Sequence, residues 1–588
     1  MKKILLVVLL LLSSSVLFAG PIGEQRARQI AEDFFASHST RSVAGEITLE
    51  WAGDVIGSKS AVGSTLNSSL MYIFNKGSKD GFVVVAGDSN VEPIIAYSLN
   101  TTIDVDNMAE ATEAILEAWC RQVESARQVA KPISGGANKL STRSYDALLL
   151  ETAIWNQSEP FNLEAPKING TRSVTGCVAT AMSIICYYHK WPDCGVGTTP
   201  EYSYDHSSGY TYTVPANKLG RTYEYSKMLS DYNNGYTTAQ GNAVAALMKD
   251  MGTAVQMMYH PNGSGAYDGN VIVALAEYFK YAKSLRLLSG NSYTSQEWND
   301  IIRENIKRYG PTYFSGMSAT GGGHAFVVDG YDTENRFHFN FGWGGYGNGY
   351  FLIPSIEYYL DQAAIVGLEP DKDGTSTYVD DIQLIPLYSD NVLMFRGITN
   401  EETSYSHNVP FDSLLGGFRN NGIAKFNGSV KLVLCDKNGE WKQVLKTYNI
   451  TLSAGYYTYV NQWVSTTITT SLSEGDRLRI YYKGEYSDDW QWARGSDITL
   501  TNDELLVVAS PKELAEGVNI TYDKASKKLS FELKHASTVE LVDAATGVAV
   551  YNGSIAARGG FSYDVKAGQT LICKFSLGST PYELTLKF

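Results

Sequence analysis

Apolar residues recur at helical spacing in several separate stretches of the chain. Within residues 25–37, apolar side chains such as Ala27 and Phe34 fall on one face, which predicts an amphipathic helix. Another helix is predicted after Thr294-Ser295-Gln296-Glu297, a capping-box sequence, and ends before Gly310-Pro311. The same spacing predicts helices at about 108–129, 177–191, 241–251 and 269–283.

The period changes to two in other stretches. Residues 71–74 and 81–85 are β-rich runs joined by the turn-rich residues 75–80, which predicts a hairpin. Beyond about residue 369, short strands alternate with turn residues, so we expect two β-sandwich modules divided near Ser510-Pro511. Four runs after the helix that begins near Thr294 predict strands of one antiparallel sheet, at 313–317, 324–329, 337–341 and 350–353.

These patterns predict an α+β protein of several units. Residues 1–20 read as a secretory signal, with Lys2-Lys3, an apolar run and a small-residue exit at Ala19-Gly20, so we expect a secreted or cell-surface protein. No later stretch has the roughly 20 apolar residues of a spanning helix. The remaining units are an α+β unit with an exposed linker (21–147), a helical half followed by a sheet half (148–370), and the two β-sandwich modules (371–510 and 511–588).

Composition narrows the classes of partner and cofactor. The formal net charge of -14 gives nucleic-acid binding no electrostatic support. The six cysteines are scattered without a CxxC pair, which favours neither a zinc module nor a dense disulfide framework, although a bridge between Cys186 and Cys194 stays open. There is no HExxH, and Asp371-Lys372-Asp373-Gly374 lacks the other ligands of a calcium loop. We therefore expect no metal and no cofactor.

Cys177 is the first candidate for chemistry. Gly176 allows a tight turn before it, and small residues follow it in the predicted helix. A helix N-terminus has unpaired N–H groups and a positive dipole end, both of which favour a thiolate over a thiol. Most cysteines in this situation are buried structural residues. The interpretation of Cys177 as a nucleophile therefore depends on a partner elsewhere in the chain.

His324 is that partner, at the start of a predicted strand behind the three glycines of residues 321–323. If the following hairpin turns at residues 332–335, position 324 lies opposite a position between 340 and 344, an interval that contains Asn340 and Trp343. An asparagine amide can hold an imidazole by a hydrogen bond, and an indole can shield that bond from water. We predict a catalytic histidine, with Gly322, Gly323 and Trp343 beside the substrate.

Together these residues resemble a known family, the streptopain family of bacterial cysteine proteases in the papain clan. The resemblance covers about residues 148–368, and an upstream part at 72–98 is similar to the inhibitory propeptide of the family. The motifs that carry it are Thr175-Gly176-Cys177-Val178-Ala179-Thr180-Ala181, Gly323-His324-Ala325-Phe326-Val327-Val328-Asp329-Gly330 and Asn340-Phe341-Gly342-Trp343-Gly344-Gly345.

The resemblance implies a papain-like catalytic domain and a role for each matched residue. Cys177 would be the nucleophile, His324 the general base and acid, Asn340 the residue that orients the imidazole, and Gln157 the side-chain donor of the oxyanion hole. One position departs from the family pattern, because Phe341 stands where a tryptophan usually follows the orienting asparagine. The implied reaction is peptide hydrolysis by a thiolate–imidazolium pair through an acyl-enzyme.

The order of the units predicts latency. Residues 21–130 precede the catalytic region, and we expect them to act as an intramolecular inhibitor until the linker is cut between about 131 and 148. The expected partners are thus protein or peptide substrates and the chain's own propeptide. Two alternatives stay open: a papain-like acyltransferase, and a degenerate protease that acts as an adhesin.

Overall fold

The computed structural model divides the chain into two compact units, Met1–Thr377 and Tyr378–Phe588. The predicted signal and linker lie outside the described residues. The structure describes residues 20–588 apart from gaps at 39–44, 55–68, 109, 130–145, 206–208, 210, 319–321, 355–358, 390–391, 396, 401–404, 406–407, 409, 415–416, 460–462, 474, 498–500, 502, 508–517, 524–525, 534–536, 556–559 and 578–579.

The N-terminal region of the first unit is a four-stranded antiparallel sheet covered by a helix on each face. The helices are α1 (Glu24–His38) and α2 (Glu110–Val129), and the predicted hairpin is confirmed as β2 and β3. Side chains alternate along β2, so that Phe74 packs against α1 while Ile73 packs on the side of α2. The strands are β1 (Ile47–Gly53), β2 (Met71–Lys76), β3 (Phe82–Ala86) and β4 (Ile94–Ser98), and η1 (Val105–Asn107) precedes α2.

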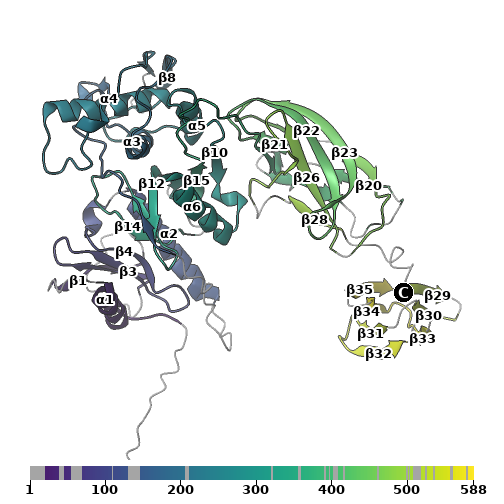
Figure 1. The fold of residues 1–588 in the computed structure, drawn as a ribbon. Helices are drawn as coiled ribbons and strands as arrows, with labels where there is room; N and C mark the ends of the chain where they lie inside the picture. Colours follow the sequence, from purple (N-terminus) through teal and green to yellow (C-terminus); the bar gives the residue numbers. More distant parts are fainter. Residues whose placement is uncertain are drawn as a thin grey trace, which may run out of the picture. The chain divides into compact units, whose positions relative to one another are not determined.

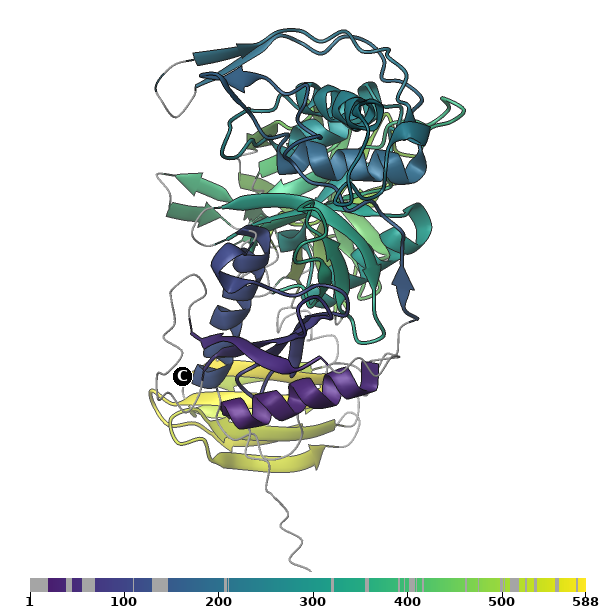
Figure 2. The same cartoon turned by 90° about the vertical axis from the view of Figure 1, so that its left-hand side faces the viewer.

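The second region has the expected helical half and sheet half (Figures 1 and 2). The capping box at the start of α6 is confirmed, with reciprocal bonds between Thr294 and Glu297. The helix predicted to reach residue 283 ends instead at Glu277, and Lys280 takes a positive φ of 53°. The helices are α3 (Cys177–His189), α4 (Thr238–Ala254), α5 (Asp268–Glu277) and α6 (Ser295–Tyr309), with short helices η2 (Tyr225–Lys227) and η3 (Gly290–Ser292).

The sheet half contains the four predicted strands and three that the pattern did not predict. The predicted ones are β11 (Thr312–Met317), β12 (Gly323–Tyr331), β13 (Phe337–Asn340) and β14 (Gly349–Phe351). The additional strands are β5 (Leu148–Leu149), β10 (Arg286–Ser289) and β15 (Leu360–Val366). Two small hairpins lie apart from this sheet, β6 (Lys167–Ile168) with β7 (Thr171–Arg172), and β8 (Tyr202–Asp205) with β9 (Thr211–Val214).

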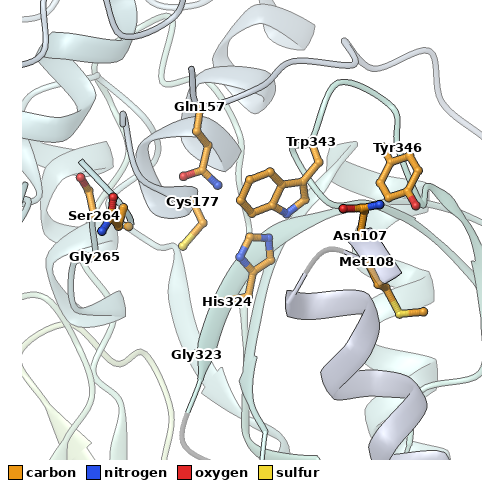
Figure 3. A pocket seen from close by; sticks show the side chains of 12 residues that line it. Asn107, Met108, Gln157, Cys177, Ser264, Gly265, Gly323, His324, Trp343 and Tyr346 are labelled. Atoms are coloured by element: carbon orange, nitrogen blue, oxygen red, sulfur yellow. The ribbon is translucent and has the colours of Figure 1, made fainter. Parts of the chain in front are cut away.

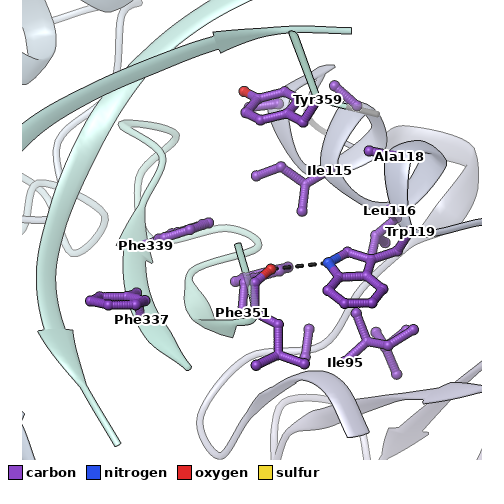
Figure 4. Close-up of a cluster of buried hydrophobic side chains, with 14 of the residues drawn as sticks. Ile95, Ile115, Leu116, Ala118, Trp119, Phe337, Phe339, Phe351 and Tyr359 are labelled. Carbon is purple, nitrogen blue, oxygen red and sulfur yellow. Dashed lines mark hydrogen bonds between the residues drawn. The ribbon is translucent and has the colours of Figure 1, made fainter. Parts of the chain in front are cut away.

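One continuous sheet of 11 strands joins the two regions, because β4 pairs antiparallel with β14. Tyr97 faces Tyr350 across this pair, and Leu352 N–H donates to Ile95 O at 2.9 Å. The indole of Trp119 in α2 donates to Leu352 O at 3.0 Å inside a large apolar cluster (Figure 4). The N-terminal region is therefore bound to the second region by backbone pairing and by a shared core.

In the described residues of the second unit, antiparallel sheets surround two large cores, and a third, smaller cluster is formed by Val433, Cys435 and Tyr481. The first core includes Leu384, Phe418, Leu432 and Ile480. Its strands are β16 (Ile382–Ile385), β17 (Leu387–Ser389), β18 (Val392–Phe395), β19 (Thr399–Asn400), β20 (Pro410–Leu414), β21 (Gly417–Asn420), β22 (Phe426–Cys435), β23 (Trp441–Leu452), β24 (Tyr457–Tyr459), β25 (Trp463–Thr467), β26 (Arg477–Gly484), β27 (Gln491–Trp492) and β28 (Glu504–Leu506).

The second core, in the C-terminal part of this unit, includes Phe531, Leu541 and Cys573. The predicted division near Ser510-Pro511 lies outside the described residues. The strands of this part are β29 (Val518–Asp523), β30 (Lys528–Leu533), β31 (Ser537–Asp543), β32 (Ala549–Ile555), β33 (Gly560–Asp564), β34 (Thr570–Leu577) and β35 (Thr580–Lys587).

Candidate active site

A pocket of about 590 Å³ brings the sequence-predicted residues Gln157, Cys177, Gly323, His324 and Trp343 together (Figure 3). A turn after α4 contributes four more lining residues, Asn262, Gly263, Ser264 and Gly265. The others are Tyr346 of the second region and Asn107 and Met108 of the N-terminal region. Segments that are far apart in sequence therefore meet around one thiol and one imidazole.

Cys177 is the first residue of α3, as the sequence predicts. Gly176 is its N-cap, with φ 87° and ψ 145°, a left-handed conformation that glycine adopts without a steric penalty. The helix that follows is buried along nearly its whole length, and Thr180 Oγ1 donates back to Gly176 O at 2.9 Å. The nucleophile candidate is thus placed on a rigid element, with part of its surface exposed in the pocket.

The surroundings of Cys177 shift the pKa of its thiol. Burial raises its pKa above the ordinary value, and the carboxylate of Asp268 adds to the rise. Hydrogen bonds from the backbone of Ala325 and Val178 offset part of the effect. Burial of the thiol thus opposes the effect of the helix N-terminus on its pKa in this form.

His324 lies on β12, where it pairs with Gly316 of β11. Its ring is near-parallel to two aromatic rings, Trp343 at 5.8 Å and 16° and Phe326 at 6.1 Å and 18° between centroids. The imidazole Nε2 lies 2.9 Å from the main-chain oxygen of Phe341. The indole of Trp343 thus lies beside the imidazole, whereas its predicted shielding of a bond between Asn340 and His324 stays a prediction.

The expected hydrogen bond from Asn340 to the imidazole is wrong for this structure. Within the described residues, the amide nitrogen of Asn340 donates to Thr152 Oγ1 at 3.0 Å and to Ala153 O at 2.9 Å. In the antiparallel pair of β12 and β13, Asn340 lies opposite Val327, three residues along β12 from His324. Asn340 remains close to the histidine only through the backbone that follows it.

Gln157 is buried and belongs to the same pocket, with its amide beside Cys177 in Figure 3. Thr175 N–H donates to Gln157 O at 3.0 Å, which ties this loop to the turn just before the nucleophile. An amide here and the N–H groups at the start of α3 are donors of the kind that stabilise an oxyanion. The role of Gln157 as such a donor stays a prediction.

The substrate-binding candidates are not all placed alike. Gly323 and Trp343 line the pocket, whereas Gly322 does not, since its N–H is held by Ser318 Oγ at 3.1 Å. The pattern missed Ser264 and Gly265, and also Asn107 and Met108 from the N-terminal region. Asn262-Gly263-Ser264-Gly265 reads as a turn, but no local signal shows that this turn lies beside a residue some 90 positions earlier.

Other candidate chemistry is unsupported in the part of the chain that the structure describes. Its six cysteines are not joined to one another, so Cys186 and Cys194 form no bridge here. Cys186 is buried, with the hydroxyl of Tyr281 at 3.7 Å from its sulfur. Within the same residues no cluster of His, Cys, Asp and Glu is arranged to hold a metal ion. In the described helices there is none both long and apolar enough to cross a membrane.

A cysteine at the start of a buried helix, facing a histidine on an antiparallel sheet, defines a cysteine protease of papain-like architecture. Comparison with known proteins agrees. Residues 155–351 match the model of the Peptidase C10 family, and residues 19–123 match that of the Spi protease inhibitor. The chain belongs to the peptidase C10 family, whose streptopain members it resembles over most of their length.

Individual relatives cover different shares of the chain. Streptopain of Streptococcus pyogenes is 30% identical over 373 residues, which are 59% of this chain and 92% of that protein. Thiol protease/hemagglutinin PrtT of Porphyromonas gingivalis is 32% identical over 403 residues, which are 63% of this chain but only 45% of PrtT. The solved Prevotella intermedia prointerpain A fragment has 26% identity and a TM-score of 0.44, and covers 55% of this chain and 99% of the fragment.

Proposed function

We propose that this protein is an exported cysteine endopeptidase made as a zymogen, with Cys177 as nucleophile and His324 as general base and acid. The sulfur attacks a peptide carbonyl to form a thioester while the amine leaves with a proton from the imidazole. Water then hydrolyses the thioester and restores the thiol. The developing oxyanion is bound by the Gln157 amide and the Cys177 N–H. The substrates are proteins or peptides.

The zymogen part of the proposal rests on one observation. The N-terminal region contributes Asn107 and Met108 to the pocket that also contains Cys177 and His324. In Figure 3 these two residues lie on the side of Trp343, opposite Ser264 and Gly265. The hydroxyl of Tyr346, which also lines the pocket, accepts from Asp104 N–H at 2.7 Å and donates to Asp104 O at 3.1 Å. Residues 21–130 therefore border the cleft on one side, where a substrate would have to lie.

A charged contact also supports inhibition by residues 21–130. Arg336, in the sheet that carries His324, is 1% exposed and donates through Nε to Ile94 O at 2.9 Å. Its guanidinium lies 3.5 Å from Glu92, and Tyr97 OH donates to Asp332 at 3.2 Å. When the regions separate, this buried cation loses the partners that the N-terminal region supplies. Its contacts to both regions therefore stabilise the inhibited form.

The test is self-processing of the full-length protein. The Cys177→Ala chain should stay at full length, whereas the wild type and a Cys194→Ala control should shorten and gain activity on casein in step with a cut between residues 131 and 148. Addition of the isolated 21–130 fragment to the processed enzyme should lower activity. An uncut chain as active as the processed one would contradict the inhibitory role.

The same assay separates the alternatives. Casein fragments without incorporation of an added amine support the endopeptidase. Amine incorporation without hydrolysis would indicate an acyltransferase, and an intact chain that does neither would indicate a binding protein.

A further inference from the structure

The segment that opens the catalytic region, residues 148–153, runs along the strand that carries His324. Leu148 and Leu149 form β5, paired with Tyr331 and Gly330 of β12. The next residue continues the contact, since Leu150 N–H donates to Asp329 O at 2.9 Å. The segment thus begins where the predicted linker ends, and we call residues 148–153 the strap.

Thr152 of the strap sits between two buried polar groups. Its hydroxyl donates to Asp329 Oδ2 and accepts from Asn340 Nδ2 at 3.0 Å. Both Asp329 and Asn340 are 1% exposed. The other carboxylate oxygen of Asp329 lies 2.5 Å from His338 Nδ1, so this carboxylate is held from both sides.

Asn340 in turn holds the backbone that contacts the imidazole. Its side-chain oxygen accepts from Gly342 N–H at 3.3 Å, and its amide nitrogen also donates to Ala153 O at 2.9 Å. Between Asn340 and Gly342 lies Phe341, whose carbonyl oxygen is 2.9 Å from His324 Nε2. Hydrogen bonds and the short backbone stretch 340–342 therefore connect the strap to the histidine.

We propose that Thr152 is a positioning residue for catalysis: through Asn340 it fixes the Phe341 carbonyl that orients His324. The proposal rests on the proposed protease function. A hydroxyl suits this position because it donates and accepts at once, and Asp329 needs a donor while the Asn340 amide needs an acceptor. Valine has nearly the same shape and does neither, so Asp329 and Asn340, both buried, each lose one of their hydrogen-bond partners.

The position of the strap also limits where the zymogen is cut. A cleavage upstream of Leu148 leaves every one of these contacts in the mature enzyme. Trimming through Thr152 removes β5 together with the hydroxyl that contacts Asp329 and Asn340. The strap is thus a part of the active site that the mature enzyme has to retain, although it follows directly on the linker.

The experiment compares Thr152→Val, Thr152→Ser and a matched Thr171→Val control in the full-length chain, after self-processing. Thr171 lies on β7 and is exposed. Rates are expressed per active-site thiol, titrated with an irreversible cysteine reagent, so that misfolded protein does not count. We expect Thr152→Val to lower kcat by between about 10- and 100-fold with KM within about twofold, since it loosens orientation rather than binding. Thr152→Ser should stay near the wild type.

Each outcome decides the proposal. It is overturned if kcat per titrated site of Thr152→Val equals that of Thr171→Val, if only KM changes, or if Thr152→Ser loses as much as Thr152→Val. If Thr152→Val fails to fold, Thr152→Ala takes its place with the same expectation, because it also lacks the hydroxyl and is smaller. Failure of the wild type and of Thr171→Val to hydrolyse casein would instead overturn the proposed function.

Discussion

Gly176→Ala is the change that tests most directly how the nucleophile is positioned. Gly176 has φ 87°, and a methyl group on it would lie 2.6 Å from Met257 Sδ and 2.9 Å from the main-chain oxygen of Ser264. The methionine side chain can rotate away. The Ser264 backbone is less free, because its own hydroxyl donates to Val174 O at 2.8 Å and accepts from His260 N–H at 2.9 Å.

Two costs add up at this position. A non-glycine residue at positive φ costs about 1–2 kcal/mol. Forcing an extra methyl into a packed site costs a further 1–3 kcal/mol or so. We therefore expect Gly176→Ala to lower the free energy of unfolding by about 2–5 kcal/mol. Ser264 lines the pocket, so kcat/KM should fall as well.

Gly170→Ala is the matched control. Gly170 has nearly the same φ, 82°, but a methyl group there would have no neighbour within 4 Å. Its cost should be the backbone part alone, about 1–2 kcal/mol, with unchanged kcat/KM. The difference between the two variants includes the contact with Met257 and Ser264.

Urea unfolding in a Cys177→Ala background measures the stability, since that background prevents self-cleavage. Hydrolysis of a peptide substrate by the same variants with Cys177 restored measures the activity. The reasoning is refuted if both glycine variants unfold at the same urea concentration, or if Gly176→Ala keeps wild-type kcat/KM.

Two further predictions concern the chemistry. Gln157→Ala should lower kcat by on the order of 10²- to 10³-fold with KM little changed, because an oxyanion donor acts chiefly in the transition state. Steady-state hydrolysis measures both constants, and a change confined to KM would contradict that role. Since burial raises the pKa of Cys177 in the uncut form, little thiolate exists there at neutral pH, and iodoacetamide should alkylate Cys177 only as the pH rises. After removal of residues 21–130, the rise in the alkylation rate should move to lower pH. Mass spectrometry follows alkylation at each pH, and superimposable rate–pH curves for the uncut and processed forms would exclude this effect.

The sequence by itself determined the features that depend on near neighbours in the chain. A glycine before a run of small apolar residues places the start of α3 at Cys177, and Thr294 with Glu297 places the start of α6. Runs of β-branched and aromatic residues predict β2, β3 and the strands around His324. Caps and periodicity are local properties, so a single sequence carries them completely.

Only the tertiary structure decided which groups meet at the site. Strand pairing places Asn340 opposite Val327, three residues from His324, and the backbone of Phe341 contacts the imidazole where the asparagine side chain was expected. The pairing of β4 with β14 brings Asn107 into the pocket of Cys177. The pKa of the Cys177 thiol likewise depends on its surroundings, since burial raises it against the effect of the helix terminus that the local sequence supplies.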